Sequence, residues 1–122
     1  MERLVIIPTY NEKENIAAII DAVMNLPLRF HVLVIDDGSP DGTADIVKGL
    51  MKTTYPETLH IVERRGKQGL GTAYIAGFRW AIEHKADYIF EMDADFSHNP
   101  DDLLKLYEAC ANDNIHRIDG DH

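Results

Sequence analysis

Short apolar runs alternate along the chain with longer segments in which apolar residues recur at every third or fourth position. Proline, glycine or polar residues bound the short runs, which are too brief for helices and therefore predict buried strands. The longer segments each carry one apolar stripe, which predicts amphipathic helices. The predicted strands are residues 4–7, 31–35, 59–63 and 88–92.

A helix is predicted after each strand. Asn11 is expected to cap the first helix, which Pro27 ends, and the third helix should span residues 72 to about 85. Asn99 should cap the fourth helix, with Pro100 in its first turn. This alternation of short apolar strands with helices predicts an α/β fold with a mostly parallel sheet and helices on both of its faces.

The loops after the predicted strands are expected to carry the chemistry, because ligands of such sheets bind beyond the carboxyl ends of the strands. These loops read PTYNE, DDGSPDG, RRGKQGLG and DADFSHN, and all are polar. Two of them contain a pair of acids, Asp36 with Asp37 and Asp93 with Asp95. A buried carboxylate is unfavourable without a partner, so each pair predicts either a solvated turn or a ligand site.

Asp93 and Asp95 have three interpretations. They could form a solvated turn before the fourth helix, hold a divalent ion such as Mg²⁺ or Mn²⁺, or act as an acid–base pair. If strand alternation continues through them, both point to one side and Ala94 to the other. Asp36 and Asp37 could accept hydrogen bonds from a ribose or base, or could form the turn that follows.

The glycine-rich segment GKQGLGTAY does not predict a dinucleotide site. Gly69 and Gly71 follow the third strand rather than the first, and Tyr74 stands where a third glycine is required. The six histidines form no pair at the spacing of zinc ligands.

Composition and charge narrow the class of protein. The 122 residues are enough for one domain, and no apolar run is long enough to span a membrane. A net charge of −9 argues against nucleic acid as a partner, and means that a phosphate ligand needs a bound cation or local basic groups such as Arg64 and Arg65. The single cysteine, Cys110, is typical of a reducing compartment and predicts a cytoplasmic protein.

Four segments together resemble one family: IIPTYNEKENI, VIDDGSPDGTADI, GKQGLGTAYIAGF and MDADFSHNPDDL. They look like the nucleotide-binding half of family 2 glycosyltransferases, and most like the polyprenol-phosphate (dolichol-phosphate) mannosyltransferases. The resemblance covers residues 3 to about 114. It implies a Rossmann-like GT-A fold, GDP-mannose as donor and a polyprenyl or dolichyl phosphate as acceptor.

The resemblance also implies site residues. Asp93 and Asp95 would be catalytic and would hold Mg²⁺ or Mn²⁺. The residues expected to bind the nucleotide sugar are Pro8, Tyr10, Glu12, Ile35, Asp37, Asp93, Ala94 and Asp95. Transfer would proceed by direct displacement with inversion, in a protein that is cytoplasmic or peripheral at the cytoplasmic membrane face.

The family pattern departs from this chain after about residue 114, where the family continues and this sequence reads IHRIDGDH. Residues 1–114 are expected to form the nucleotide-sugar-binding domain and 115–122 an irregular tail. A truncated chain of this kind should bind nucleotide weakly and should transfer sugar poorly or not at all when alone. Two alternatives stay open: a UDP-sugar donor, and a non-catalytic nucleotide-binding or interaction module. An uncovered sheet edge could also drive self-association.

Overall fold

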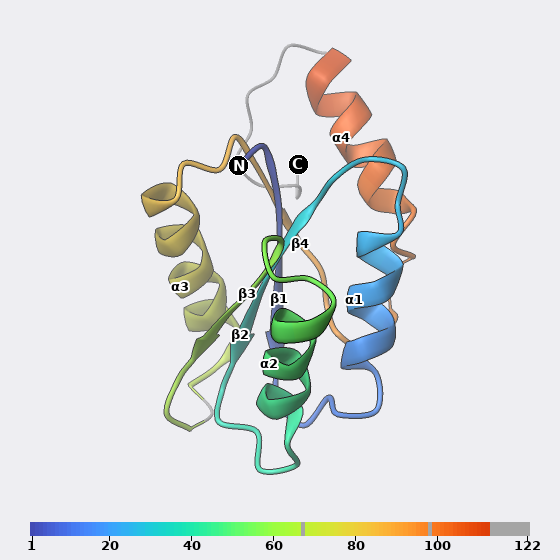
Figure 1. Cartoon of the computed structure of the whole chain (residues 1–122). Coiled ribbons are helices and arrows are strands. Elements are labelled where there is room, and N and C mark those ends of the chain that lie inside the picture. Colours follow the sequence, from blue (N-terminus) through green and yellow to red (C-terminus); the bar gives the residue numbers. More distant parts are fainter. Residues whose placement is uncertain (67, 98, 113–122) are drawn as a thin grey trace.

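The computed structural model describes residues 1–66, 68–97 and 99–112. Within these residues, strands and helices alternate along the chain, which confirms the predicted α/β class (Figure 1). The strands are β1 (Arg3–Thr9), β2 (His31–Asp36), β3 (Leu59–Glu63) and β4 (Tyr88–Glu91). The helices are α1 (Ile16–Met24), α2 (Thr43–Thr53), α3 (Leu70–Glu83) and α4 (Asp102–Asn112). The predicted tail, residues 115–122, lies outside the described residues.

The strands form one parallel sheet in the order β3-β2-β1-β4. Val5 of β1 lies opposite Val32 of β2 on one side and Phe90 of β4 on the other. The chain moves outward from β1 to β3 and then returns to the other side of β1. The carboxyl ends of β1 and β4 therefore flank the point where the strand order reverses, which is the usual ligand position in such sheets.

Helices cover both faces of the sheet, as predicted. Helices α1, α2 and α4 contribute to the core on one face, and α3 to the core on the other (Figure 1). Because successive side chains of a strand point to opposite faces, Val5 and Ile7 join the first core, whereas Leu4 and Ile6 join the second. All four side chains are fully buried.

Helix α3 lies close to the sheet because its inner face is built from small residues. Ala73, Gly77 and Ala81 are buried at four-residue spacing. A Cβ atom added to Gly77 would lie 2.7 Å from Cγ2 of Ile6, closer than real Cβ contacts allow. The absence of a side chain at Gly77 thus sets the distance between α3 and β1.

The end of β4 follows from Pro8 on the neighbouring strand. The Ile6 carbonyl accepts a hydrogen bond from the Met92 N–H at 3.0 Å, so the polar groups of Ile6 and Pro8 face β4. The next ladder bond would need an N–H at Pro8 to donate to the Met92 carbonyl, and proline has none. Strand β4 accordingly ends at Glu91, one residue earlier than predicted, and Asp93 to Asp95 do not belong to a regular strand.

The predicted cap at Asn11 is wrong. Helix α1 begins only at Ile16, preceded by Asn15. Asn11 has a φ of 58°, in the left-handed region, and its N–H donates to Ser39 Oγ at 2.8 Å. A contact with a residue far along the chain thus overrides the local capping signal.

The predicted cap at Asn99 has its hydrogen bond, since Asn99 Oδ1 accepts from the Asp101 N–H at 3.0 Å. The regular part of α4 starts at Asp102.

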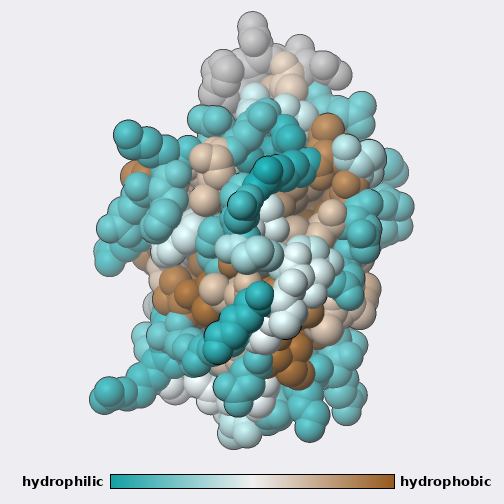
Figure 2. All heavy atoms as spheres, in the orientation of Figure 1, coloured by the Kyte–Doolittle hydropathy of each residue, from teal (hydrophilic) through white to brown (hydrophobic). Residues whose placement is uncertain are grey.

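Polar side chains dominate the face shown in Figure 2, with apolar side chains in separate patches. In the described part of the chain, no helix is both long and apolar enough to cross a membrane.

Candidate active site

A pocket of about 310 Å³ lies at the carboxyl ends of β1 and β4. It contains most of the residues that the resemblance implies: Pro8, Tyr10, Glu12, Asp37, Asp93, Ala94 and Asp95 line it. Ile35 is not among the lining residues. It is fully buried on β2, in the core beneath α3.

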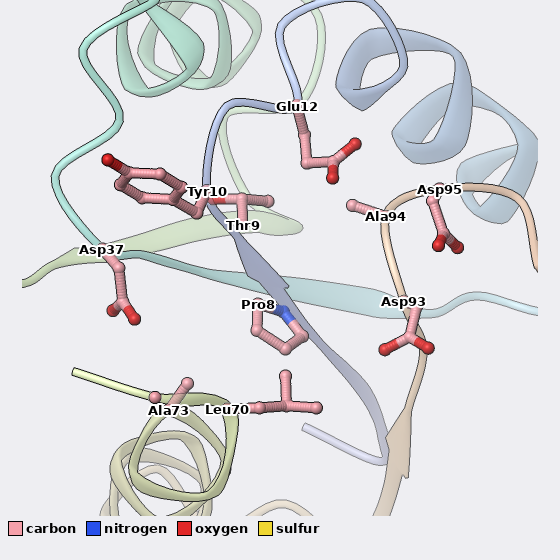
Figure 3. Close-up of a pocket in the computed structure, with 11 residues that line it drawn as sticks. Pro8, Thr9, Tyr10, Glu12, Asp37, Leu70, Ala73, Asp93, Ala94 and Asp95 are labelled. Carbon is pink, nitrogen blue, oxygen red and sulfur yellow. The ribbon is translucent and has the colours of Figure 1, made fainter. Parts of the chain in front are cut away.

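The acids lie on different sides of the pocket. Asp37 is on one side of Pro8, and Asp93 and Asp95 are on the other (Figure 3). Glu12 extends from the loop after β1 toward the segment that carries Ala94 (Figure 3). The pocket is therefore an acidic hollow with carboxylates at both ends.

Asp37 is held by an arginine whose side chain is largely buried. Arg64 Nε lies 2.7 Å from Asp37 Oδ1, and Arg64 Nη2 lies 3.0 Å from Oδ2, so the pairing is bidentate. Arg64 also donates to Thr72 Oγ1 at 3.1 Å. The side chains of Arg64 and Asp37 are only 11% and 8% exposed. The arginine compensates the charge of Asp37 and fixes the direction of its carboxylate.

The other acid of that pair, Asp36, has a structural role. Its Oδ1 accepts hydrogen bonds at 2.7 Å from Thr9 Oγ1 and from Ser39 Oγ, and its Oδ2 accepts from the Ser39 N–H at 3.0 Å. These bonds tie the end of β1 to the turn after β2. Asp36 thus holds the turn, whereas Asp37 lines the pocket.

The loop after β2 also holds the loop after β1. Thr43 Oγ1 accepts from the Glu12 N–H, and Asp41 Oδ2 accepts from the Lys13 N–H, both at 3.1 Å. Asp41 in turn accepts from the hydroxyl of Thr43, and this hydrogen bond lowers the pKa of Asp41. Glu12 therefore reaches the pocket from a backbone that α2 and its preceding turn keep in place.

Asp93 and Asp95 follow β4 in irregular backbone. Asp93 Oδ1 accepts from the Tyr74 hydroxyl of α3 at 3.3 Å, and Asp95 Oδ1 accepts from the Ser97 N–H at 3.0 Å. Burial, together with the charges of Asp93 and Glu91, raises the pKa of Tyr74, which keeps the phenol protonated. Ala94 is buried in the core on the α1 face, so it points away from α3.

The donors of the pocket suit a hard divalent cation. None of the described residues that line it is a lysine, arginine or histidine. No group of three or more potential metal ligands occurs among the described residues. Mg²⁺ and similar ions are commonly held by one or two carboxylates together with substrate phosphates. The pair Asp93 and Asp95 therefore fits a cation that binds together with a phosphate ligand.

Four further lining residues had no role in the sequence prediction: Thr9, Gly69, Leu70 and Ala73. Leu70 and Ala73 belong to the first turn of α3, which starts two residues before its predicted position. They occupy neighbouring positions on one helix face. If the sequence analysis had started this helix at residue 70, it would have placed that helix face beside the acidic loops.

Two curated relatives are closely similar in sequence. The chain is 46% identical over 106 residues to the polyprenol monophosphomannose synthase of Mycolicibacterium smegmatis, covering 87% of this chain and 40% of the relative. It is 45% identical over 109 residues to the undecaprenyl-phosphate mannosyltransferase of Micrococcus luteus, covering 89% and 44%. The chain thus spans less than half the length of these relatives.

Solved structures share the fold. A mannosyltransferase from Pyrobaculum calidifontis, in complex with GDP-Man and Mn²⁺, matches with a TM-score of 0.62 and 30% identity over 66% of this chain and 24% of its own. Residues 1–349 of TarS from S. aureus, in complex with UDP, match with a TM-score of 0.75 and 22% identity over 92% and 32%.

The sequence profile described as "Glycosyl transferase family 2" matches residues 4–118. It spans the parallel sheet, the acidic pocket and the loops that build both, and it covers most of the chain. The chain belongs to glycosyl transferase family 2.

Proposed function

We propose that this chain is the nucleotide-sugar-binding part of a mannosyltransferase that transfers mannose from GDP-mannose to a polyprenyl phosphate. One observation carries the proposal: the fold gathers seven residues implied by the family motifs around one acidic pocket at the reversal point of the sheet. The names of the two relatives support a mannosyl donor and a polyprenyl phosphate acceptor. Such an acceptor would place the reaction at a membrane face.

In this proposal the two ends of the pocket bind different parts of the donor. Asp37, oriented by Arg64, accepts hydrogen bonds from the base or ribose. Asp93 and Asp95 lie at the other end and hold Mg²⁺ or Mn²⁺ at the diphosphate. The complex of the Pyrobaculum enzyme with GDP-Man and Mn²⁺ supports this choice of ligands. Tyr10 and Glu12 also line the pocket, and the Tyr10 ring lies on the same side of Pro8 as Asp37 (Figure 3).

The chemistry is a displacement at C1 of mannose. The bond between C1 and the diphosphate oxygen breaks, GDP leaves with the bonding electrons, and a phosphate oxygen of the acceptor forms the new bond on the opposite face. When bound, the divalent cation neutralises the charge that develops on the leaving diphosphate. A phosphate monoester has a second pKa of about 6 and is largely ionised at neutral pH, so positioning matters more than a general base.

Calorimetric titration with GDP, UDP and GDP-mannose, each with and without Mn²⁺, tests this proposal. We expect GDP and GDP-mannose to bind only with Mn²⁺ present, and Asp95→Ala to weaken that binding at least tenfold, because a charged ligand of the cation is lost. Preference for UDP would instead favour a UDP-sugar donor. Absence of binding to every nucleotide would favour a non-catalytic interaction module.

A further inference from the structure

The hydroxyls of Tyr55, Tyr74 and Tyr107 donate to carboxylates. Tyr55 bonds Asp21 at 2.6 Å, Tyr107 bonds Glu2 at 2.7 Å, and Tyr74 bonds Asp93 at 3.3 Å. Only the last of these carboxylates lines the pocket. The first two bonds are exposed, whereas Tyr74 is partly buried against the core beneath α3.

The sheet does not fix the carboxylate of Asp93. Regular pairing of β4 ends at Glu91, and Pro8 prevents the ladder from continuing past Met92. A side-chain contact can therefore help to set the direction of the Asp93 side chain. In residues 1–66, 68–97 and 99–112, the contact that reaches it is the Tyr74 hydroxyl.

Tyr74 is itself held in place by the packing of α3. Its neighbour Ala73 is 1% exposed, and Gly77, one turn further on, lies against Ile6. Helix α3 therefore packs closely on β1 at this point. A hydroxyl on this closely packed helix gives Asp93 a partner on a regular element, although Asp93 itself lies in irregular backbone.

We propose that Tyr74 is a positioning residue, which orients Asp93 by binding Oδ1 so that Oδ2 is directed to the cation and diphosphate. This inference rests on the proposed function of the pocket. The hydroxyl does not touch the reacting atoms. It reduces the number of orientations available to Asp93 before the ligand binds, and so lowers the entropy loss on binding.

The variant Tyr74→Phe tests the inference, because it removes the hydroxyl and keeps the ring. Mn²⁺ affinity is measured in the presence of GDP by electron paramagnetic resonance of free Mn²⁺. We expect the affinity to fall about threefold to tenfold, as for the loss of one hydrogen bond. Thermal unfolding should be little changed. Tyr55→Phe is the control, because it also removes a tyrosine–carboxylate hydrogen bond but away from the pocket, and it should leave Mn²⁺ affinity at the wild-type value.

A double variant separates positioning from a general structural effect. In the background of Asp93→Ala, adding Tyr74→Phe should weaken Mn²⁺ binding no further, because the hydroxyl then has no carboxylate to orient. Unchanged Mn²⁺ affinity in Tyr74→Phe, or an equal loss in both backgrounds, would overturn the inference and leave the proposed function intact. Absence of Mn²⁺-dependent GDP binding in the wild-type chain would overturn both this inference and the proposed function. That outcome is seen in the wild-type titration, before any variant is made.

Discussion

At the scale of single residues, the largely buried pair of Arg64 and Asp37 contributes both to the pocket and to the stability of the protein. Replacing Arg64 by alanine leaves the carboxylate of Asp37 buried without its cation. We expect this to lower the free energy of unfolding by about 3–5 kcal/mol. Arg64→Lys should recover only part of the loss, since an ammonium group cannot make the bidentate contact. Urea-induced unfolding measures both values.

An exposed ion pair provides the comparison. Arg29 Nη2 lies 3.6 Å from Glu57 Oε1, and the two side chains are 62% and 80% exposed. Arg29→Ala should therefore change the free energy of unfolding by less than about 1 kcal/mol. Similar small losses in Arg64→Ala and Arg29→Ala would show that burial adds nothing to the pair at the pocket.

Arg64 and Asp37 are too far apart in the sequence for a local pattern to predict that they pair. Arg64 was predicted only as part of a basic patch, and its partner stands 27 positions earlier. Acid-bearing loops were predictable, because the carboxyl ends of parallel strands meet at one edge. The sequence alone could not show that Asp36 holds the turn while Asp37 lines the pocket. That distinction depends on the hydrogen bonds of Asp36 with Thr9 and Ser39, which only the folded chain brings together.

At the scale of secondary structure elements, the packing of α3 on β1 depends on Gly77. A methyl group at this position would meet Ile6 at 2.7 Å, so α3 must move or Ile6 must change rotamer. Gly77→Ala should lower the free energy of unfolding by about 1–3 kcal/mol, although alanine favours helices. Thermal or urea unfolding checks this value.

Gly49 in α2 is the matched control. A Cβ added there would meet nothing within 4 Å. Gly49→Ala should therefore stabilise the protein by about 0.5–1 kcal/mol, because only the helix propensity changes. Stabilisation by both substitutions would contradict the close approach of α3 to β1.

Element boundaries show where sequence patterns lose information. The β3 segment matches its predicted range, because a short apolar run with polar ends is a purely local signal. The start of α1 was wrong by several residues, since Asn11 is held by Ser39 of another loop. The end of β4 depends on Pro8 of the neighbouring strand, and neighbours in a sheet cannot be read from one strand alone.

At the scale of the whole molecule, stability should depend on pH through a histidine pair at the sheet end opposite the pocket. His31 Nδ1 lies 3.1 Å from His60 Nε2, with the two ring planes 7° apart. Burial, followed by the positive charges that His60 and Arg29 can carry, lowers the pKa of His31 to about 4. Burial and the neighbouring His84 also lower the pKa of His60.

These shifts fix the sign of the pH effect. An unfolded chain, with histidine pKa values of about 6.5, binds more protons than the folded chain between that pH and about 4. The free energy of unfolding should be greatest above pH 6.5 and should fall as the pH drops toward 4. His31→Gln should flatten this profile in urea titrations from pH 4 to 7.5. An identical slope in the variant would contradict a role for His31.

Pro8 has a consequence for the energetics of ligand binding. Because its ring nitrogen carries no hydrogen, β1 cannot donate the next ladder hydrogen bond to β4. The opening between Pro8 and Asp93 thus follows from the covalent structure of proline, which lacks an N–H. A ligand that enters it has no inter-strand hydrogen bonds to break, so this part of the cleft is preorganised before any ligand arrives.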